Sequence, residues 1–223
     1  MDMARETNLT EIVFILDRSG SMGGLESDTI GGFNSMLTQQ QAEPGEARIT
    51  TVLFDHEYEI LHDRLDIRAV NPITSKDYFV RGNTALLDAV GKTIHKIGNT
   101  QRHSRPEFRA NKVIFVITTD GLENASREYT YNRVKSQITR HKSKYGWEFI
   151  FLGADIDSAE FAGRFGIARN RAQNFIKDPE GIHLNYQVVN KAVASFRSPA
   201  NSCLDDGWNV EIEANYQRRK NQS

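Results

Sequence analysis

Three oxygen-bearing side chains stand at alternating positions directly after a short apolar run. The run is Ile12–Leu16, and the side chains that follow it are Asp17, Ser19 and Ser21. Five consecutive apolar residues are typical of a strand buried on both faces. In an open parallel α/β sheet, ligands bind just outside the carboxyl ends of the strands, so these side chains would lie at a binding position. Oxygen-only donor sets favour hard cations such as Mg²⁺, Mn²⁺ or Ca²⁺.

Two further segments supply oxygen donors of the same kind. A second apolar strand, predicted over 112–119, is followed by Asp120, and the turn that opens the helix predicted at 84–98 carries Thr84. If the two strands are neighbours at the topological switch point of the sheet, these oxygens converge. The predicted metal ligands are Asp17, Ser19, Ser21, Thr84 and Asp120. Mg²⁺ takes six oxygens, so a position stays open, and two carboxylates only neutralise the ion; such a site attracts a partner's carboxylate.

Hydrophobic periodicity predicts strands that alternate with helices along the chain. Strands are expected at 12–16, 47–54, 57–62, 112–119, 147–153 and 171–176. Helices are expected at 25–42, 84–98, 128–144, 158–165 and 181–197. Only Asp55 and His56 separate the second strand from the third, which is too short for a parallel crossover, so this pair must be antiparallel. The pattern predicts a doubly wound α/β sheet of about six strands.

Composition sets the class of protein. The chain has 223 residues, enough for one large α/β domain without disulfides, and its single cysteine excludes an internal disulfide. With 28 basic and 29 acidic residues, the charge balance gives no general case for nucleic acid or membrane partners. The sequence shows neither the apolar core of a signal peptide nor a run of about 18 apolar residues, which leads us to expect a cytoplasmic protein. We expect one domain over 10–197 and a polar, partly ordered tail over 198–223.

Three short motifs occur in order along the chain, each on the element expected for it. They are Asp17-x-Ser19-x-Ser21, Gly82-Asn83-Thr84 and Thr119-Asp120-Gly121. Together they resemble the complete metal-ion-dependent adhesion site (MIDAS) of the von Willebrand factor type A (vWA) domain family. The resemblance covers about residues 10–197 and implies a sheet of order 3-2-1-4-5-6 with strand 3 antiparallel, in agreement with the hairpin. It also implies that Ser19, Ser21 and Thr84 ligate the metal, that Asp17 and Asp120 often act through water, and that a partner's glutamate or aspartate completes the shell.

The main hypothesis is a non-enzymatic binding module inside the cell, of bacterial or phage type, whose Mg²⁺ or Mn²⁺ docks the acidic side chain of a partner protein. The rim that a partner touches is expected to include Met22, Asn83, Glu123 and Asn124, although Glu123 and Asn124 equally fit a lead into the next helix. The sequence does not define the oligomeric state.

Two alternatives stay open. A Mg²⁺-dependent phosphatase or hydrolase can use a similar sheet, but haloacid-dehalogenase-like phosphatases carry a second aspartate two residues after the first, and this chain has Ser19 there. A regulatory subunit of a partner ATPase is also compatible with the resemblance, although the chain itself has no ATPase motif.

Three features lie outside the predicted metal site. A basic loop fits either a solvated connection or a site for an anionic partner; it contains Arg102, His103, Arg105, Arg109 and Lys112. Asp157 is predicted to cap the helix at 158–165, with Glu160 three residues on as in a capping box. The resemblance makes the last predicted helix a candidate to shift when ligand binds.

Overall fold

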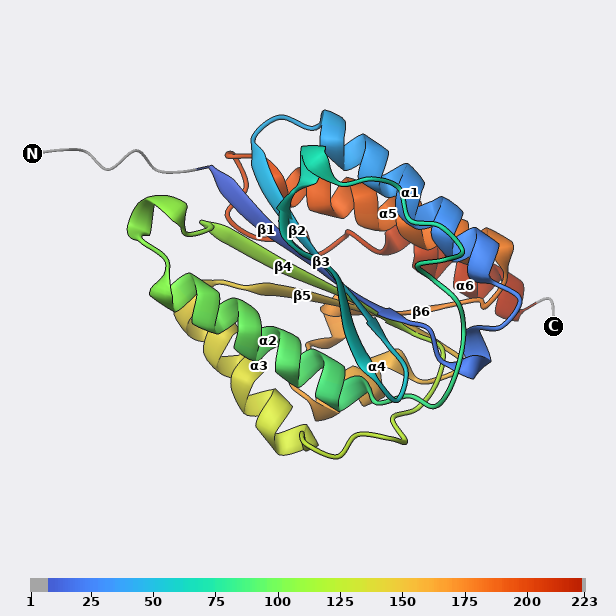
Figure 1. Cartoon of the computed structure of the whole chain (residues 1–223). Helices are drawn as coiled ribbons and strands as arrows, with labels where there is room; N and C mark the ends of the chain where they lie inside the picture. The colour runs from blue at the N-terminus through green and yellow to red at the C-terminus, as the bar shows by residue number, and fades with distance from the viewer. Residues whose placement is uncertain (1–7, 222–223) are drawn as a thin grey trace, which may run out of the picture.

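The computed structural model describes residues 8–221 and places one mixed sheet between two layers of helices (Figure 1). The strands are β1 (Leu9–Asp17), β2 (Glu46–Phe54), β3 (Tyr58–Asp66), β4 (Lys112–Thr119), β5 (Glu148–Ala154) and β6 (Ala172–Phe175). The helices are α1 (Glu26–Ala42), α2 (Leu86–His103), α3 (Tyr131–Tyr145), α4 (Ser158–Arg164), α5 (Pro179–Arg197) and α6 (Val210–Lys220). The strand order is β3-β2-β1-β4-β5-β6, and β3 runs antiparallel to β2. The predicted doubly wound sheet is therefore confirmed.

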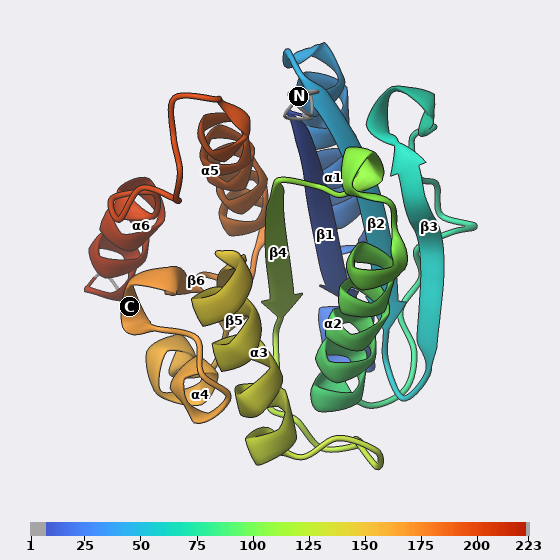
Figure 2. The ribbon, with the colours of Figure 1, turned by 90° about the vertical axis from the view of Figure 1, so that its left-hand side faces the viewer.

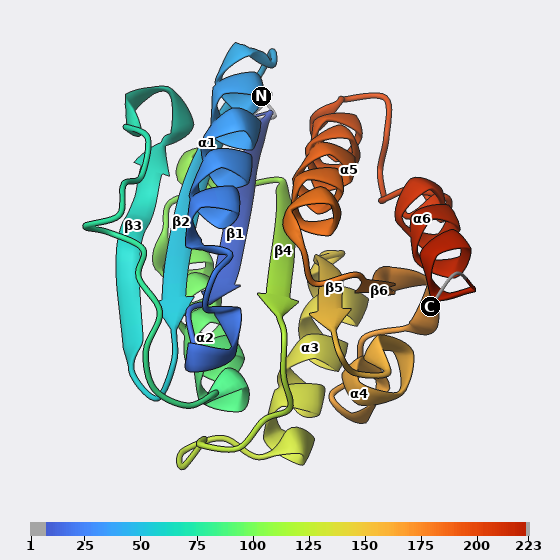
Figure 3. The same cartoon turned by 90° about the vertical axis from the view of Figure 1, so that its right-hand side faces the viewer.

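Strand β1 forms the middle of the core because both of its faces are apolar. Ile12, Phe14 and Leu16 belong to a cluster that includes residues of α1, α5 and α6. Val13 and Ile15 alternate with them and belong to the opposite cluster, which includes residues of α2, α3 and α4. Figures 2 and 3 show these two helix layers on either side of the sheet. Side chains of a strand alternate between faces, so one continuous apolar strand anchors both layers.

The pairing of β1 with β4 positions the predicted metal ligands. The two strands are parallel neighbours, and Leu16 lies opposite Thr118 in their register. Their carboxyl ends therefore lie side by side, as the arrowheads in Figure 3 show. The loop after Asp17 and the loop after Thr119 leave the sheet together at this end.

The carboxyl-terminal segment differs from the expected polar tail. Residues 210–220 form α6, and the segment contributes Leu204, Trp208 and Ile212 to the core cluster that contains α5. These three residues recur every four positions, a weak apolar pattern within a polar stretch. The side chain of Gln173 in β6 also donates to Glu213 of α6 at 2.6 Å. The segment is thus packed against the sheet, and it includes a helix that the sequence analysis did not predict.

The other element boundaries differ from the predictions by small margins. Helix α2 continues to His103, beyond the predicted end at residue 98. The apolar pattern did not predict this last part because residues 99–103 are polar and none of them is buried. The predicted cap of α4 is present, since Asp157 accepts a hydrogen bond from the Glu160 amide at 2.9 Å. No helix within residues 8–221 combines the length and apolarity that a membrane crossing requires.

Candidate metal centre

The loop after β1 is joined to the loop after β4 by a chain of hydrogen bonds. Asp17 accepts from the Ser19 amide at Oδ1 (2.7 Å) and from the Thr119 hydroxyl at Oδ2 (2.6 Å). The hydroxyls of Ser19 and Ser21 lie 3.0 Å apart, and Ser21 Oγ donates to Asp120 Oδ1 at 2.5 Å. Four of the five predicted ligands are therefore in one hydrogen-bonded cluster, although Ser21 and Asp120 are 99 positions apart in sequence.

Thr84 brings the fifth predicted ligand, the third hydroxyl of the set, to the same place from a third loop. A Cβ added at Gly121 would lie 3.8 Å from Ser21 Oγ and 4.0 Å from Thr84 Oγ1, so both hydroxyls face the space beside Gly121. The Thr84 amide donates to Asn124 Oδ1 at 2.9 Å, and the Asn124 amide donates back to the Thr84 carbonyl at 3.0 Å. We call the group Asp17, Ser19, Ser21, Thr84 and Asp120 the candidate metal site.

Two residues of the predicted rim form hydrogen bonds that hold the loops of the site in place. Glu123 accepts from the Leu87 amide in the first turn of α2 at 2.9 Å and from the amides of Ala125 and Ser126. A carboxylate at a helix N-terminus is stabilised by the unpaired amides there. Because the side chain of Asn124 is bonded to Thr84, both residues help to position the site. Asn124 is also exposed, so its place on the rim stays a prediction.

The exposed surface around the site differs from the prediction at two further positions. Met22 is only 5% exposed and packs in the core, so it does not form a rim in this structure. Asn83 and Ser21 are exposed, as a partner contact requires. Leu122, which was not predicted, is 58% exposed two residues after Asp120.

A buried arginine in the loop after β1 ties this loop to the β2–β3 hairpin, and the sequence analysis did not single it out. Arg18 is fully buried, and its Nε donates to Asp55 at 2.9 Å while Nη1 donates to Glu59 at 2.6 Å. Arg81 reaches the same Asp55 oxygen at 2.8 Å. The Tyr78 hydroxyl donates to the Asp17 carbonyl at 2.6 Å. The β2–β3 hairpin and the segment before α2 thus fix the path of the loop after β1.

Comparison with known proteins places this fold in a family. The model of the von Willebrand factor type A domain family matches residues 11–185. The chain belongs to this family. No curated protein matches the sequence of this vWA domain at a significant level.

Solved structures share the vWA fold with this chain at low sequence identity. The vWF domain of the type V pili tip protein Mfa5 from Porphyromonas gingivalis has a TM-score of 0.59 and 14% identity, covering 86% of this chain and 97% of that one. Proximal thread matrix protein 1 from the mussel byssus, with a zinc-occupied MIDAS motif, has a TM-score of 0.55 and 13% identity over 83% of this chain. Manganese-loaded TRAP protein from Plasmodium vivax has a TM-score of 0.50 and 20% identity over 66% of this chain and 57% of that one. This chain spans about half the length of the mussel protein, at 46%.

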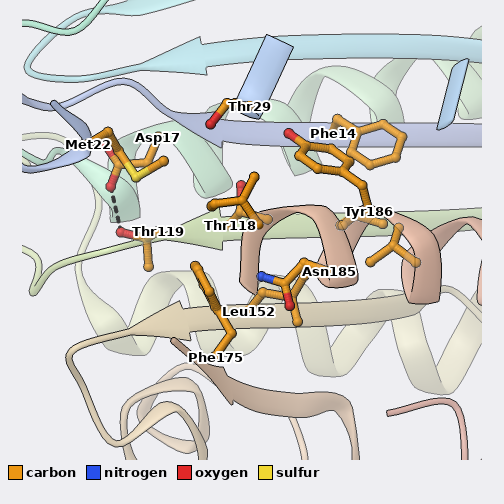
Figure 4. Close-up of a pocket in the computed structure, with 13 residues that line it drawn as sticks. Phe14, Asp17, Met22, Thr29, Thr118, Thr119, Leu152, Phe175, Asn185 and Tyr186 are labelled. Atoms are coloured by element: carbon orange, nitrogen blue, oxygen red, sulfur yellow. Dashed lines mark hydrogen bonds between the residues drawn. The ribbon is translucent and has the colours of Figure 1, made fainter. Parts of the chain in front are cut away.

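Burial dominates the electrostatics of Asp17 in this vWA domain. Desolvation raises the pKa of the Asp17 carboxyl to about 6, the hydrogen bonds from Ser19 and Thr119 partly offset this rise, and the nearby charge of Asp120 adds to it. Asp17 lies at one end of an apolar cavity of about 20 Å³ that α5 covers (Figure 4). That volume has room for one water molecule but not for an organic ligand. The Asp17 carboxylate therefore lies between this apolar cavity on one side and the cluster of oxygen-bearing side chains on the other.

The second carboxylate has a cationic neighbour that the sequence analysis did not predict. Lys177 Nζ lies 2.9 Å from Oδ2 of Asp120, whose side chain is fully buried. The contact is an ion pair without the geometry of a hydrogen bond. Lys177 belongs to the connection between β6 and α5, so a fourth loop reaches the site.

The donor set fits a hard divalent cation. Within residues 8–221, no cluster of three or more His, Cys, Asp or Glu has the arrangement of a metal site, so a zinc-type set of soft ligands is not present there. The candidate metal site instead offers hydroxyl and carboxylate oxygens, which suit Mg²⁺ or Mn²⁺. The buried Oδ2 of Asp120 accepts no hydrogen bond, and the cation beside it is the Lys177 ammonium at 2.9 Å.

The predicted basic loop lies at the opposite end of the vWA sheet. Arg102 and Arg109 line a cleft of about 490 Å³ between the carboxyl-terminal halves of α2 and α3, together with Arg140, His141 and Trp147. Arg109 donates to the carbonyls of Ser104 and Arg102, at the end of α2. A cation near a helix C-terminus is stabilised by the helix dipole, which accounts for part of this charge without a ligand.

Proposed function

We propose that this chain is a metal-dependent protein-binding module. The hydroxyls of Ser19, Ser21 and Thr84 would hold a divalent cation, with Asp17 and Asp120 acting directly or through water. When bound, the ion supplies an electrophilic coordination position for an acidic side chain of a partner protein. The residues of the chain hold the five oxygens in place, and the partner contributes the remaining ligand.

One observation carries the proposal: five oxygen-bearing side chains from three loops converge, four of them in a continuous hydrogen-bonded cluster. Helix capping satisfies one loop at a time and does not explain bonds between loops 99 positions apart. Two carboxylates only neutralise the charge of one divalent cation. The coordination position that the five side chains leave open could therefore still accept an anionic ligand from a partner.

The comparisons support a divalent ion but do not select one. One similar structure has zinc in its MIDAS motif, and another is a manganese-loaded protein. Another is the pilus adhesin SpaC from Lactobacillus rhamnosus GG. For this chain we propose Mg²⁺ or Mn²⁺, with Ca²⁺ as the weaker fit, because three neutral hydroxyls and two carboxylates form a small donor set.

The exposed residues around the site suggest what a partner would present. Ser21 and Asn83 are exposed polar groups, and Leu122 adds an exposed apolar side chain beside Asp120. We propose that the partner offers an aspartate or glutamate with an apolar residue nearby. A metal contact supplies orientation, and the apolar contact adds buried area.

Calorimetric titration of Mg²⁺ and of Mn²⁺ into the wild type and Asp17→Ala tests the metal site. Wild type is expected to bind one equivalent, and Asp17→Ala is expected to bind none. Asp63→Ala is a matched control, since Asp63 pairs with Lys96 on the surface, away from the site. Equal binding by the wild type and Asp17→Ala would refute the assignment.

A second experiment tests the binding role. Proteins captured from a lysate by the wild type should include a species that is lost on adding a chelator and is not captured by Asp17→Ala. If Asp17→Ala captures the same proteins as the wild type, and the chelator does not release them, partner binding does not depend on the metal and the proposed role is wrong.

The enzymatic alternative has less support from the geometry. Asp17 is 1% exposed and both of its oxygens accept hydrogen bonds, so it does not present a nucleophile to a substrate. A nucleophilic carboxylate must be within reach of the reacting atom. No contact within the described residues favours the role of an ATPase regulatory subunit over other binding roles.

A further inference from the structure

Lys177, which forms an ion pair with Asp120, is not among the predicted metal ligands. Both carboxylate oxygens of Asp120 have a neighbour: Ser21 Oγ donates to Oδ1 at 2.5 Å, and Lys177 Nζ forms an ion pair with Oδ2 at 2.9 Å. The side chain of Asp120 is fully buried, while that of Lys177 is 25% exposed. The ammonium therefore reaches inward from the surface to a buried carboxylate of the candidate metal site.

The backbone that carries Lys177 is held on both sides. Asp178 caps α5 by accepting from the Gly181 amide at 2.8 Å, and it forms an ion pair with Arg219 of α6. A Cβ at Gly181 would lie 1.9 Å from the Ile176 carbonyl oxygen, so only glycine permits this close approach. The connection is tightly packed, and the position of the Lys177 backbone near Asp120 follows from the fold.

A divalent cation and the ammonium would compete for the same oxygens. Both are attracted to the Asp120 carboxylate, and like charges at a few ångströms repel strongly where water is largely excluded. The lysine side chain is flexible and partly exposed, so its ammonium can move into solvent with little loss of packing. A bound ion would displace the lysine more easily than it would displace a serine hydroxyl in the cluster.

We propose that the Lys177 ammonium competes with the divalent cation for the Asp120 carboxylate. By neutralising Asp120, Lys177 lowers the affinity of the site for the metal ion. The proposal rests on the proposed metal-binding function and adds a residue outside the five-residue set. It means that the affinity of the site for the ion is lower than its oxygen donors alone would give. It also connects the site to α6, because Asp178, next to Lys177, pairs with Arg219.

Calorimetric titration of Mn²⁺ into three charge variants tests this role. Lys177→Met keeps much of the side-chain volume and removes the charge, so it is expected to bind Mn²⁺ on the order of tenfold more tightly than the wild type. Lys177→Arg keeps the charge and should resemble the wild type. Lys191→Met is the matched control because Lys191 pairs with Glu211 on the exposed side of α5; its affinity should not change.

A thermal measurement separates competition from a merely structural role. Lys177→Met leaves the buried Asp120 charge without its cation, so saturating Mn²⁺ should raise the Tm of this variant more than that of the wild type. Equal Mn²⁺ affinities and equal Tm increases would overturn the proposal and leave the metal site intact, provided that Asp17→Ala abolishes binding. If neither the wild type nor Lys177→Met binds Mn²⁺, the proposed function fails and this inference fails with it.

Discussion

The two ends of the sheet differ in what surrounds them. At the amino end of the strands, a cleft of about 490 Å³ is lined by three arginines and no acidic residue. At the carboxyl end, the enclosed space beneath Asp17 is about 20 Å³. The volume of the cleft alone would favour a binding site at the amino end. The oxygen-bearing side chains that could hold a metal ion lie at the carboxyl end.

The difference lies in where the polar side chains that line each space find partners. In the amino-end cleft, Arg109 donates to the carbonyl of Ser104 and the His141 ring bonds to the carbonyl of Gln137, both within a few residues in sequence. At the carboxyl end they bond between loops, as Ser21 does with Asp120. Bonds within a segment stabilise that segment, whereas bonds between loops fix a spatial arrangement of donors. Such an arrangement is what a metal ion requires.

The largest expected effect comes from the buried arginine at the carboxyl end. Arg18→Ala removes one partner of a fully buried ion pair with Asp55 and leaves a cavity, so unfolding free energy should fall by about 3–5 kcal/mol. Arg102→Ala, in the amino-end cleft, removes an exposed side chain and should change stability by less than about 0.5 kcal/mol. Urea denaturation of both variants measures the contrast. Similar losses would mean that the two ends are equally constrained.

The fold and the five-residue set could be predicted because they depend on local patterns. An apolar run too short for a helix gives β1, the two-residue gap forces the β2–β3 hairpin, and donors directly after parallel strands must gather at one edge. The direction of a side chain within a loop has no such pattern. Glu123 turns inward to the Leu87 amide, and Met22 packs in the core, because of contacts made by distant segments.

Lys177 and Arg18 could not be recognised for the same reason. Arg18 directly follows a buried strand, but its partner Asp55 lies in the β2–β3 turn, and only the folded path brings them together. Lys177 is a single lysine after a short strand, with nothing in the sequence to pair it with Asp120. The helix α6 was missed because it buries only Ile212, and the other two core residues of the segment, Leu204 and Trp208, precede it in a polar stretch.

A smaller but more specific effect is expected from the hydroxyls. The double variant Ser19→Ala and Ser21→Ala removes two predicted ligands and should weaken Mn²⁺ binding by at least about a hundredfold, roughly 3 kcal/mol. Ser136→Ala removes a hydroxyl from the amino-end cleft and should leave the affinity unchanged. Calorimetry gives both affinities, and far-UV circular dichroism verifies the fold. A loss of Mn²⁺ affinity in Ser136→Ala would show that the ion binds in the amino-end cleft.

Substitution of Asp17 is expected to raise the stability of the metal-free protein and to abolish metal binding. Burial raises the pKa of Asp17 to about 6, so ionised Asp17 destabilises the folded protein without metal above that pH. Asp17→Asn keeps the shape, and its amide can still accept from Ser19 and point toward Thr119. It should raise the free energy of unfolding at pH 7.5 by up to about 3 kcal/mol and abolish metal binding. Denaturation in EDTA measures the first effect; a loss of stability would show that the carboxylate supports the fold.

The pH dependence of metal affinity gives the mildest test. Metal binding requires ionised Asp17, whose pKa is raised to about 6, so Mn²⁺ affinity should be constant above that pH and fall about tenfold per pH unit below it. An aspartate with an ordinary pKa would hold its affinity down to about pH 4. Imidazole nitrogens are common metal ligands, and His95 and His141 line the amino-end cleft. The double variant His95→Gln and His141→Gln should therefore keep the wild-type profile between pH 5 and 7.5; if the fall disappears in this variant, the ion binds at the amino end and the comparison between the two ends is reversed.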